Sequence, residues 1–126
     1  MSDNYSGKYV PLVLYPRFTT RVGEGPEFYT LPLDVSAYQA ARITFWRGPI
    51  LGTSPQLKFY LEQSSDRITW TTCEGISSSG FEISEDVEKV KTVTSITRRW
   101  MRAMAILSVG DACTIWAQGF LVKRET

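Results

Sequence analysis

Residues 57–62 alternate strictly between apolar and polar or amphipathic side chains. The apolar set is Leu57, Phe59 and Leu61, and the set between them is Lys58, Tyr60 and Glu62. Successive side chains of a β-strand point to opposite faces, so this period of two predicts a strand over residues 56–64 with one face in a core. A helix would need apolar residues every three or four positions, and no stretch of the chain sustains that spacing.

The rest of the chain is also typical of β-structure. It holds 9 Val, 8 Ile, 13 Thr and 16 aromatic residues but only 7 Ala among 126 residues, which favours pleated surfaces over helices. We expect eight to ten short strands in an all-β fold, a single-domain antiparallel β-sandwich that is jelly-roll-like. Residues 1–7 are expected to form a mobile N-terminal arm and residues 8–126 the sandwich domain.

Turn residues divide the chain into the expected strands. These strands cover residues 8–15, 17–22, 27–31, 41–46, 56–64, 68–73, 81–84, 92–96, 99–108 and 113–123. Pro11 predicts that the first is an edge or bulged strand, because proline cannot donate to a central ladder. Two Gly and two Pro make residues 48–55 a loop. A tight turn at residues 64–67 joins two strands in a hairpin, and Asp34 or Ser36 is expected to cap a separate turn.

Composition excludes several classes of function. The chain has no histidine, which excludes Ser-His-Asp and Cys-His catalysis and all His-containing metal sites. Its 14 basic and 13 acidic residues give a formal charge of +1, which argues against a dedicated nucleic-acid binder. No apolar run could span a bilayer as a helix, and the first residues lack the pattern of a signal peptide. We therefore expect no enzyme, no cofactor, no nucleic acid and no membrane partner.

The two cysteines, Cys73 and Cys113, are too few for a four-cysteine zinc site. In the absence of a secretion signal, two reduced and buried thiols are expected. A disulfide stays open at this point, because it depends on how close the two Cα atoms lie in space.

Two polar segments are candidates for chemistry. Ser64 and Asp66 open a turn whose side-chain oxygens can accept from backbone N–H groups two or three positions on, with Trp70 folding back over it. The segment partly resembles the Asp-box of sialidase-like propeller blades, S-x-D-x-G-x-x-W, but lacks its Gly and has its Trp one position early. We interpret it as a structural turn.

The second polar segment is acidic and contains Glu82, Glu85, Asp86 and Glu88. Such a group could bind calcium, but it lacks the spacing and the Gly of an EF-hand loop. No spacing selects a carboxylate pair for glycoside hydrolysis between this group and Glu62 or Asp66. We interpret the segment as a solvated loop.

The aromatic and arginine residues are the candidates for binding. Three arginines flank Trp100, at Arg98, Arg99 and Arg102. They could bind phosphate, form a subunit interface or be a solvated strand start. A second set, Trp46, Tyr60, Trp70, Tyr29 and Trp116, could stack on sugars or belong to a core or an interface. The interface candidates are therefore Trp46, Tyr60, Trp70, Arg98, Arg99, Trp100 and Arg102.

The last two expected strands carry apolar residues on both faces. In residues 99–108, one face holds Met101, Ala103, Ala105 and Leu107, and the other holds Trp100, Met104 and Ile106. Such strands are central in a sheet or meet another subunit. The second alternative predicts a homo-oligomer, for example a trimer.

Several motifs follow one another in an order known from one group of proteins. They are Leu33-Asp34-Val35-Ser36-Ala37-Tyr38, Ile43-Thr44-Phe45, Gly52-Thr53-Ser54-Pro55, the strand at residues 57–62, Gln63-Ser64-Ser65-Asp66 and Thr69-Trp70. Over residues 33–121 the chain resembles small β-sandwich virion structural proteins of tailed phages and prophages. Those proteins often read D-[LV]-S-x-Y, then G-T-x-P, then E-S-x-D-G-x-T-W. Here Arg67-Ile68 replaces the usual Gly, which changes the expected turn type.

The resemblance implies a capsid decoration, head-completion or minor tail protein and no catalytic residues. The leading hypothesis is thus a non-enzymatic virion protein that binds a capsid shell or tail assembly. Its partners would be capsid or tail proteins, and it would be located in the virion after assembly in the host cytoplasm. The alternative is a carbohydrate-binding β-sandwich, lectin-like or part of a receptor-binding tail, with Trp46, Tyr60 or Trp70 exposed in a shallow groove.

Overall fold

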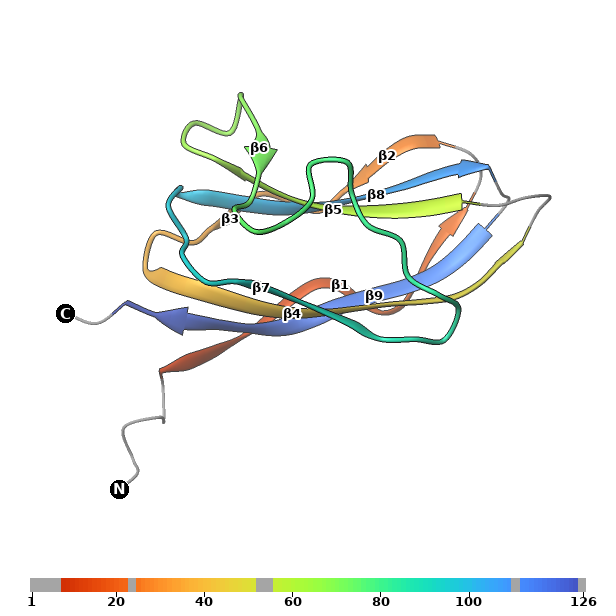
Figure 1. The fold of residues 1–126 in the computed structure, drawn as a ribbon, viewed down its shortest axis with the longest axis horizontal. Coiled ribbons are helices and arrows are strands. Elements are labelled where there is room, and N and C mark those ends of the chain that lie inside the picture. The colour runs from red at the N-terminus through yellow and green to blue at the C-terminus, as the bar shows by residue number, and fades with distance from the viewer. Residues whose placement is uncertain (1–7, 23–24, 52–55, 110–111, 125–126) are drawn as a thin grey trace, which may run out of the picture.

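The computed structural model describes residues 8–22, 25–51, 56–109 and 112–124. Within these ranges the chain forms nine strands and no helix (Figure 1). The strands are β1 Tyr9–Val22, β2 Gly25–Tyr29, β3 Leu33–Asp34, β4 Tyr38–Leu51, β5 Gln56–Ser64, β6 Thr71–Thr72, β7 Lys89–Val93, β8 Trp100–Val109 and β9 Ala112–Lys123. No helix in the described part has the length and apolar character needed to cross a membrane.

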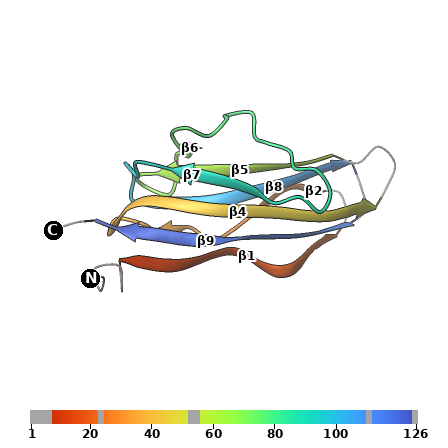
Figure 2. The same ribbon diagram turned by 60° about the horizontal axis from the view of Figure 1, so that its bottom comes forward.

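The strands form two antiparallel sheets that pack face to face (Figure 1). One sheet has the order β1-β9-β4-β7, which Figure 2 shows side by side. The other has the order β2-β8-β5-β6, with β3 also paired to β8. The chain passes from one sheet to the other at nearly every connection, as it does in a jelly roll. The predicted antiparallel, jelly-roll-like β-sandwich is confirmed.

The core lies between the two sheets and follows the alternation in the sequence. Leu57, Phe59 and Leu61 of β5 are fully buried, as the period of two predicted. The ring of Phe59 packs against Phe45 of β4, with 5.2 Å between ring centroids, and Phe45 contacts Phe81 at 5.0 Å. Each fully buried aromatic side chain contributes about 1.5–3 kcal/mol to folding, so this cluster holds the two sheets together.

Strands β8 and β9 are central, which accounts for their apolar residues on both faces. β8 lies between β5 and the pair β2 and β3, while β9 lies between β1 and β4. Met104 and Trp116 occupy outward positions, yet neighbouring side chains cover both. The central position therefore explains this pattern, and a homo-oligomer stays a prediction.

Strand β1 is a bulged edge strand, as Pro11 predicted, but it is longer than expected. It continues through Pro16 to Val22, so the expected break between two strands is wrong. The register against β9 shifts between Val13 and Tyr15 and again between Tyr15 and Thr19. An edge strand can tolerate Pro16 because its missing N–H is not needed by a second neighbour.

Two expected boundaries in the middle of the chain are also wrong. Strand β4 continues to Leu51, where a loop was expected from residue 48, because an irregularity between Arg47 and Ile50 absorbs the Gly-Pro pair. The rest of that loop, residues 52–55, lies outside the described residues. The strand expected at residues 68–73 shrinks to Thr71–Thr72, since the preceding backbone N–H groups bond to turn side chains instead of a ladder.

The region between residues 81 and 96 differs in the same way. The strand expected at residues 81–84 is a single bridge between Phe59 and Phe81. The strand expected at residues 92–96 lies earlier, at Lys89–Val93, where it pairs with β4. The arm expected at residues 1–7 lies outside the described residues.

The turn between β3 and β4 forms as expected. The backbone N–H of Ser36 donates to Oδ1 of Asp34 at 3.0 Å, and the Ser36 hydroxyl donates to the same oxygen at 2.7 Å. These hydrogen bonds, that of the backbone N–H first, hold the pKa of Asp34 below its ordinary value. Asp34 therefore stays ionised beside the start of β8.

Candidate functional site

The seven predicted interface residues separate onto the two sheets. Six lie on, or at the end of, the outer face of the β2-β8-β5-β6 sheet. These six are Tyr60, Trp70, Arg98, Arg99, Trp100 and Arg102. Trp46 lies on the outer face of the other sheet, opposite Trp116 in the register of β4 and β9. The seven residues that the sequence analysis considered together therefore belong to two separate surfaces.

Arg102 lies at the centre of a closed cluster, the Arg102 stack, made of Tyr29, Glu62, Trp70 and Arg102. The guanidinium carbon is 3.9 Å from the ring centroid of Tyr29 and 4.0 Å from that of Trp70. Its Nε donates to Oε1 of Glu62 at 2.9 Å, and the side chains of Arg102 and Glu62 are only 18% and 17% exposed. Burial also raises the pKa of Tyr29, with the charge of Glu27 adding to the effect. With both its faces and its charge satisfied, Arg102 stabilises the sheet and offers little to a partner.

Tyr60 is also held by the protein itself. A Cβ atom on Gly80 would lie 2.7 Å from Cζ of Tyr60, so the phenol ring rests directly on this glycine. Gly80 has φ +82°, a conformation that other residues rarely adopt. Of the three aromatic residues expected as alternatives in a shallow groove, Tyr60 is thus contacted by Gly80 and Trp70 by Arg102.

A second cluster, the Trp100 end, consists of Arg67, Ile68, Arg98, Arg99 and Trp100. The guanidinium carbon of Arg67 lies 4.4 Å from the Trp100 ring centroid, and that of Arg99 lies 5.2 Å from it. Arg98 donates from Nη1 to the Ser65 hydroxyl at 3.2 Å. Ile68 is 82% exposed beside these residues.

Two carboxylates order the Trp100 end: one binds an arginine side chain, and the other binds backbone N–H groups of the turn. Asp34 accepts from Nε and Nη2 of Arg99 at 3.2 and 3.1 Å. Oδ1 of Asp66 accepts from the backbone N–H groups of Ile68 and Thr69 at 2.8 and 2.9 Å, which lowers the pKa of Asp66. The expected structural turn at Ser64 and Asp66 is present, and it holds Arg67 at φ +66°. The sequence offered one indication that Arg67 and Ile68 are unusual, because they stand where the related turn motif has a glycine.

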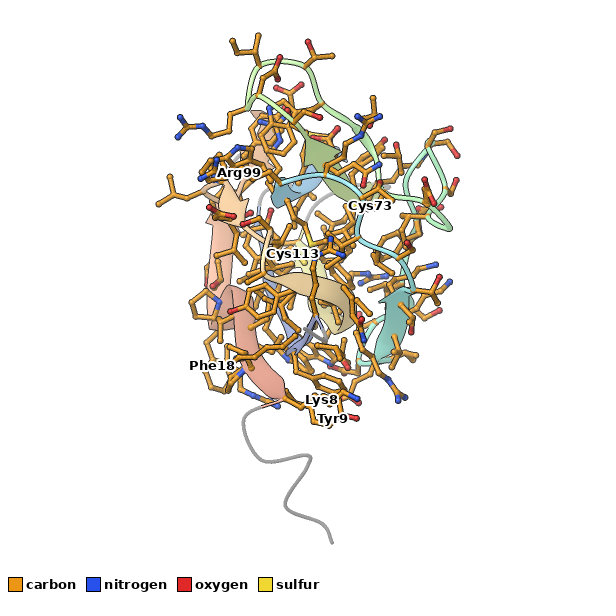
Figure 3. All side chains as sticks on the ribbon, turned by 90° about the vertical axis from the view of Figure 1, so that its left-hand side faces the viewer. Lys8, Tyr9, Phe18, Cys73, Arg99 and Cys113 are labelled. Carbon is orange, nitrogen blue, oxygen red and sulfur yellow. The ribbon has the colours of Figure 1, made fainter. Side chains whose placement is uncertain are left out.

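The outer face of the other sheet is hollowed where Trp46 lies. This depression, the Trp46 groove, has a volume of about 520 Å³ and is lined by Arg17, Phe18, Trp46, Asp86, Glu88 and Trp116. The rings of Trp46 and Trp116 are nearly parallel, at 15°, with 6.2 Å between centroids. Figure 3 shows Phe18, at this groove, and Arg99, at the Trp100 end, toward opposite layers of the sandwich. Sequence reasoning missed Arg17 and Phe18, because the bulge that brings them here has no local signature.

The acidic segment is exposed, as expected of a solvated loop, and the two cysteines are free and buried, as expected of reduced thiols. Glu82, Glu85, Asp86 and Glu88 are exposed, and the described residues contain no group of three acids or cysteines that could hold a metal ion. Cys73 and Cys113 are both free and buried. Burial raises the pKa of the Cys73 thiol to about 12 and that of Cys113 to about 11, so both stay protonated at neutral pH.

Comparisons with known proteins show the fold. No family model matches the sequence, and no curated protein sequence matches it. The chain is similar to VP2 of the infectious bursal disease virus subviral particle, with TM-score 0.54, 7% identity and coverage of 91% of this chain and 32% of that chain. It is similar to the Gt strain structure of the same virus, with TM-score 0.52, 10% identity and coverage of 90% and 32%. A carbohydrate-binding module of the β-sandwich superfamily matches with TM-score 0.49, 10% identity and coverage of 94% and 54%.

The chain spans about a third of the length of the viral proteins that it matches. At 7–10% identity the likeness to them concerns the fold alone. The chain thus has a β-sandwich fold of a kind that also occurs in viral particles.

Proposed function

We propose that this chain is a non-enzymatic structural component of a virus particle, of the decoration or cement type. It binds a capsid shell or a tail assembly through the Trp100 end. The observation that carries this proposal is the arrangement of Arg67 and Arg99 around Trp100 next to the exposed Ile68. Tryptophan and arginine dominate the binding energy of protein interfaces, and an exposed aliphatic side chain beside them adds apolar contact area.

The Trp100 end is also prepared for binding before a partner arrives. Asp34 holds Arg99 with two hydrogen bonds, and Ser64 and Asp66 hold the backbone of Arg67 and Ile68. Side chains and turns that are already ordered lose less conformational entropy on association. A rigid contact surface suits a protein that cements copies of a shell protein.

Other properties are consistent with this role. The likeness to virus particle proteins supports a particle component, and the phage-type motifs at residues 33–70 favour a tailed phage or prophage. We infer a virion location, assembly in the host cytoplasm, capsid or tail proteins as partners, and a homo-oligomer such as a trimer. A net charge of +1 fits protein partners better than nucleic acid, and we infer no membrane partner.

The test is incorporation into particles produced by the organism that carries the gene. Quantitative mass spectrometry of purified particles is expected to find the chain at a fixed copy number per shell. Ile68→Asp, which replaces the exposed apolar side chain of the Trp100 end with a charged one, is expected to lower that number at least tenfold. Leu51→Asp, at an exposed position near the far end of β4, is the matched control and is expected to leave it unchanged. Particles that lack the unmodified chain would refute the proposal.

A carbohydrate-binding module is the second candidate function, favoured by the Trp46 groove. Of the three aromatic residues expected in a shallow groove, Trp46 lines a depression with a second tryptophan, whereas Tyr60 and Trp70 contact Gly80 and Arg102. Tryptophan rings can stack on the C–H faces of sugars. Binding of the unmodified chain to a glycan array, followed by tryptophan fluorescence, tests this candidate.

A further inference from the structure

We propose that the Trp46 groove is a saccharide-binding site for a neutral glycan, whose ring stacks on Trp46 between the bulge of β1 and the acidic segment before β7. The inference rests on the second candidate function, to which it gives a site and a ligand class. It does not depend on incorporation of the chain into particles.

Two stacked tryptophan rings form the floor of the groove. A Cβ atom on Gly48 would lie 3.1 Å from Cη2 of Trp46, so the indole extends along β4 and lies over this glycine. The Trp116 ring is stacked with that of Trp46 at 15°, and the guanidinium carbon of Arg17 lies 4.4 Å from the Trp116 ring centroid. Trp116 is only 7% exposed, whereas Trp46 is half-buried. Trp46 is therefore the ring that offers a face to a ligand.

The first wall comes from the bulge of edge strand β1. The Thr19 hydroxyl donates to the Pro16 carbonyl at 2.6 Å, which closes this bulge around Arg17 and Phe18. Phe18 is 79% exposed and has φ +64°, in the left-handed region that favours glycine. The bulge thus presents an apolar ring and a guanidinium group at the rim of the groove.

The second wall carries two carboxylates, Asp86 and Glu88, on the segment before β7. The backbone N–H of Asp86 donates to the carbonyl of Arg47 at 3.0 Å, and Nε of Arg47 donates to the carbonyl of Ile83 at 2.7 Å. Arg47 thus fastens this segment to β4, one residue after Trp46. The backbone that carries Asp86 is therefore held at a defined position relative to Trp46.

Positive φ angles occur on both sides of the groove, and the one at Phe18 is the strained one, because aspartate adopts this region more readily. Among the described residues, three residues other than glycine have positive φ, and two of them, Phe18 and Asp86, line its opposite walls. Strained backbone persists where the surrounding structure enforces it, and it gathers at ligand sites. An exposed phenyl ring on a strained backbone contributes little to the fold, so a ligand contact is the simplest role for Phe18.

The chemistry of the walls selects the ligand. Two carboxylates disfavour an anion, and the guanidinium of Arg17 offsets part of their charge, so a neutral molecule with hydroxyl groups fits a lining that carries both signs. The carboxylates accept hydrogen bonds and the guanidinium donates them, which suits sugar hydroxyl groups. The aromatic floor suits the apolar C–H face of a sugar ring. A volume of about 520 Å³ lies within the range of about 300–1,000 Å³ that is typical of ligand sites.

The experiment uses the full chain on an array of neutral oligosaccharides and polysaccharides, with choline and trimethyl-lysine as cationic probes. Loss of a stacking aromatic ring is expected to weaken affinity at least about tenfold in Trp46→Ala. Phe18→Ser changes an exposed side chain, so it keeps the fold and is expected to weaken binding several-fold. Trp70→Phe, on the opposite face, is the control and is expected to bind like the unmodified chain.

Each outcome decides the proposal. Loss of glycan binding in Trp46→Ala and in Phe18→Ser, with binding retained in Trp70→Phe, supports it. Glycan binding that survives both groove variants refutes this site but leaves the carbohydrate function standing. Binding of the cationic probes without any neutral glycan refutes the ligand class. No binding to any probe refutes both the site and the carbohydrate function, and does not affect incorporation into particles.

Discussion

Both outer faces of the sandwich carry arginine and aromatic side chains, but the contacts of these side chains differ between the two faces. On the β2-β8-β5-β6 face, Arg102 lies between two aromatic rings and pairs with Glu62. On the β1-β9-β4-β7 face, Arg17 lies on Trp116 at the edge of an open depression. In the first arrangement a carboxylate pairs with the arginine, whereas in the second two stacked tryptophans line a depression between Phe18 and the acidic segment. An outward aromatic residue is therefore a binding candidate only where the fold leaves its ring uncovered.

A glycine lies against an outward aromatic ring on each face, and the two glycines contribute to the difference between the faces. Gly80 approaches Tyr60 so closely that the loop covers the phenol ring, while Gly48 lets the Trp46 indole lie flat on its own strand. Matching substitutions on the two faces therefore test how far the two surfaces differ.

The largest difference is expected between Arg102→Ala and Arg17→Ala. The first change leaves Glu62 largely buried without its ion pair and removes the contact between two rings, so it should lower the free energy of unfolding by about 2–3 kcal/mol. The second change should cost about 0.5 kcal/mol, because Arg17 is exposed. Urea denaturation followed by circular dichroism measures both. Equal losses would contradict the distinction between a closed face and an open one.

Alanine at the two glycines should separate stability from binding. Gly80→Ala forces an L side chain into positive φ, with Cβ 2.7 Å from Tyr60, and is expected to destabilise by about 1–3 kcal/mol. Gly48→Ala meets only the far edge of the Trp46 ring at 3.1 Å, so the ring can tilt at a cost below about 1 kcal/mol. Its tryptophan emission should shift while the unfolding midpoint changes little. An unchanged emission spectrum would show that the indole does not lie over Gly48.

Phe18→Gly should stabilise the chain. Glycine adopts φ +64° freely, and the lost side chain is mostly exposed, so a gain of about 0.5 kcal/mol is expected. Thermal denaturation measures the gain, and glycan binding measured on the same sample should weaken. A clear loss of stability would mean that Phe18 supports the fold, and the role assigned to its strain would be wrong.

The smallest expected effect is the change in melting temperature at low pH that comes from the two carboxylates of the Trp100 end. Hydrogen bonds lower the pKa of Asp34 and of Asp66 below their ordinary value of about 3.9. A carboxyl group with a lowered pKa in the folded state stabilises that state above its unfolded pKa, and this contribution is lost as pH falls through the folded pKa. The melting temperature should therefore fall less between pH 5 and pH 3 in Asp34→Asn than in the unmodified chain. Identical pH profiles would contradict this linkage.

The sequence predicted the features of the fold that depend on local alternation. The strand at residues 56–64 followed from its alternation, and the central position of β8 is one of the two alternatives that its two apolar faces left open. The extension of β4 through Gly48 was not predictable, because pairing with β9 overrides the turn preference of a Gly-Pro pair. The shortening of β6 depends on two side chains, Ser64 and Asp66, that compete for its backbone.

The candidate sites were predictable by residue type but not by arrangement. Trp46 was chosen as an outward aromatic residue, and Trp100 was chosen for the three arginines that flank it. Their partners lie far along the chain: Asp86 and Arg17 meet at the Trp46 groove, and Arg67 reaches Trp100 from another turn. Only the fold brings these segments together, so no local spacing could have indicated them.

Electron cryomicroscopy of particles that carry this chain is the most direct test of the central claim, that it acts as a particle component with two distinct surfaces. The account predicts density for the sandwich on the shell or tail, with Trp100 and Ile68 in the contact and the Trp46 groove facing solvent. Particles without this density, or a sandwich attached through the face that carries Trp46, would contradict it.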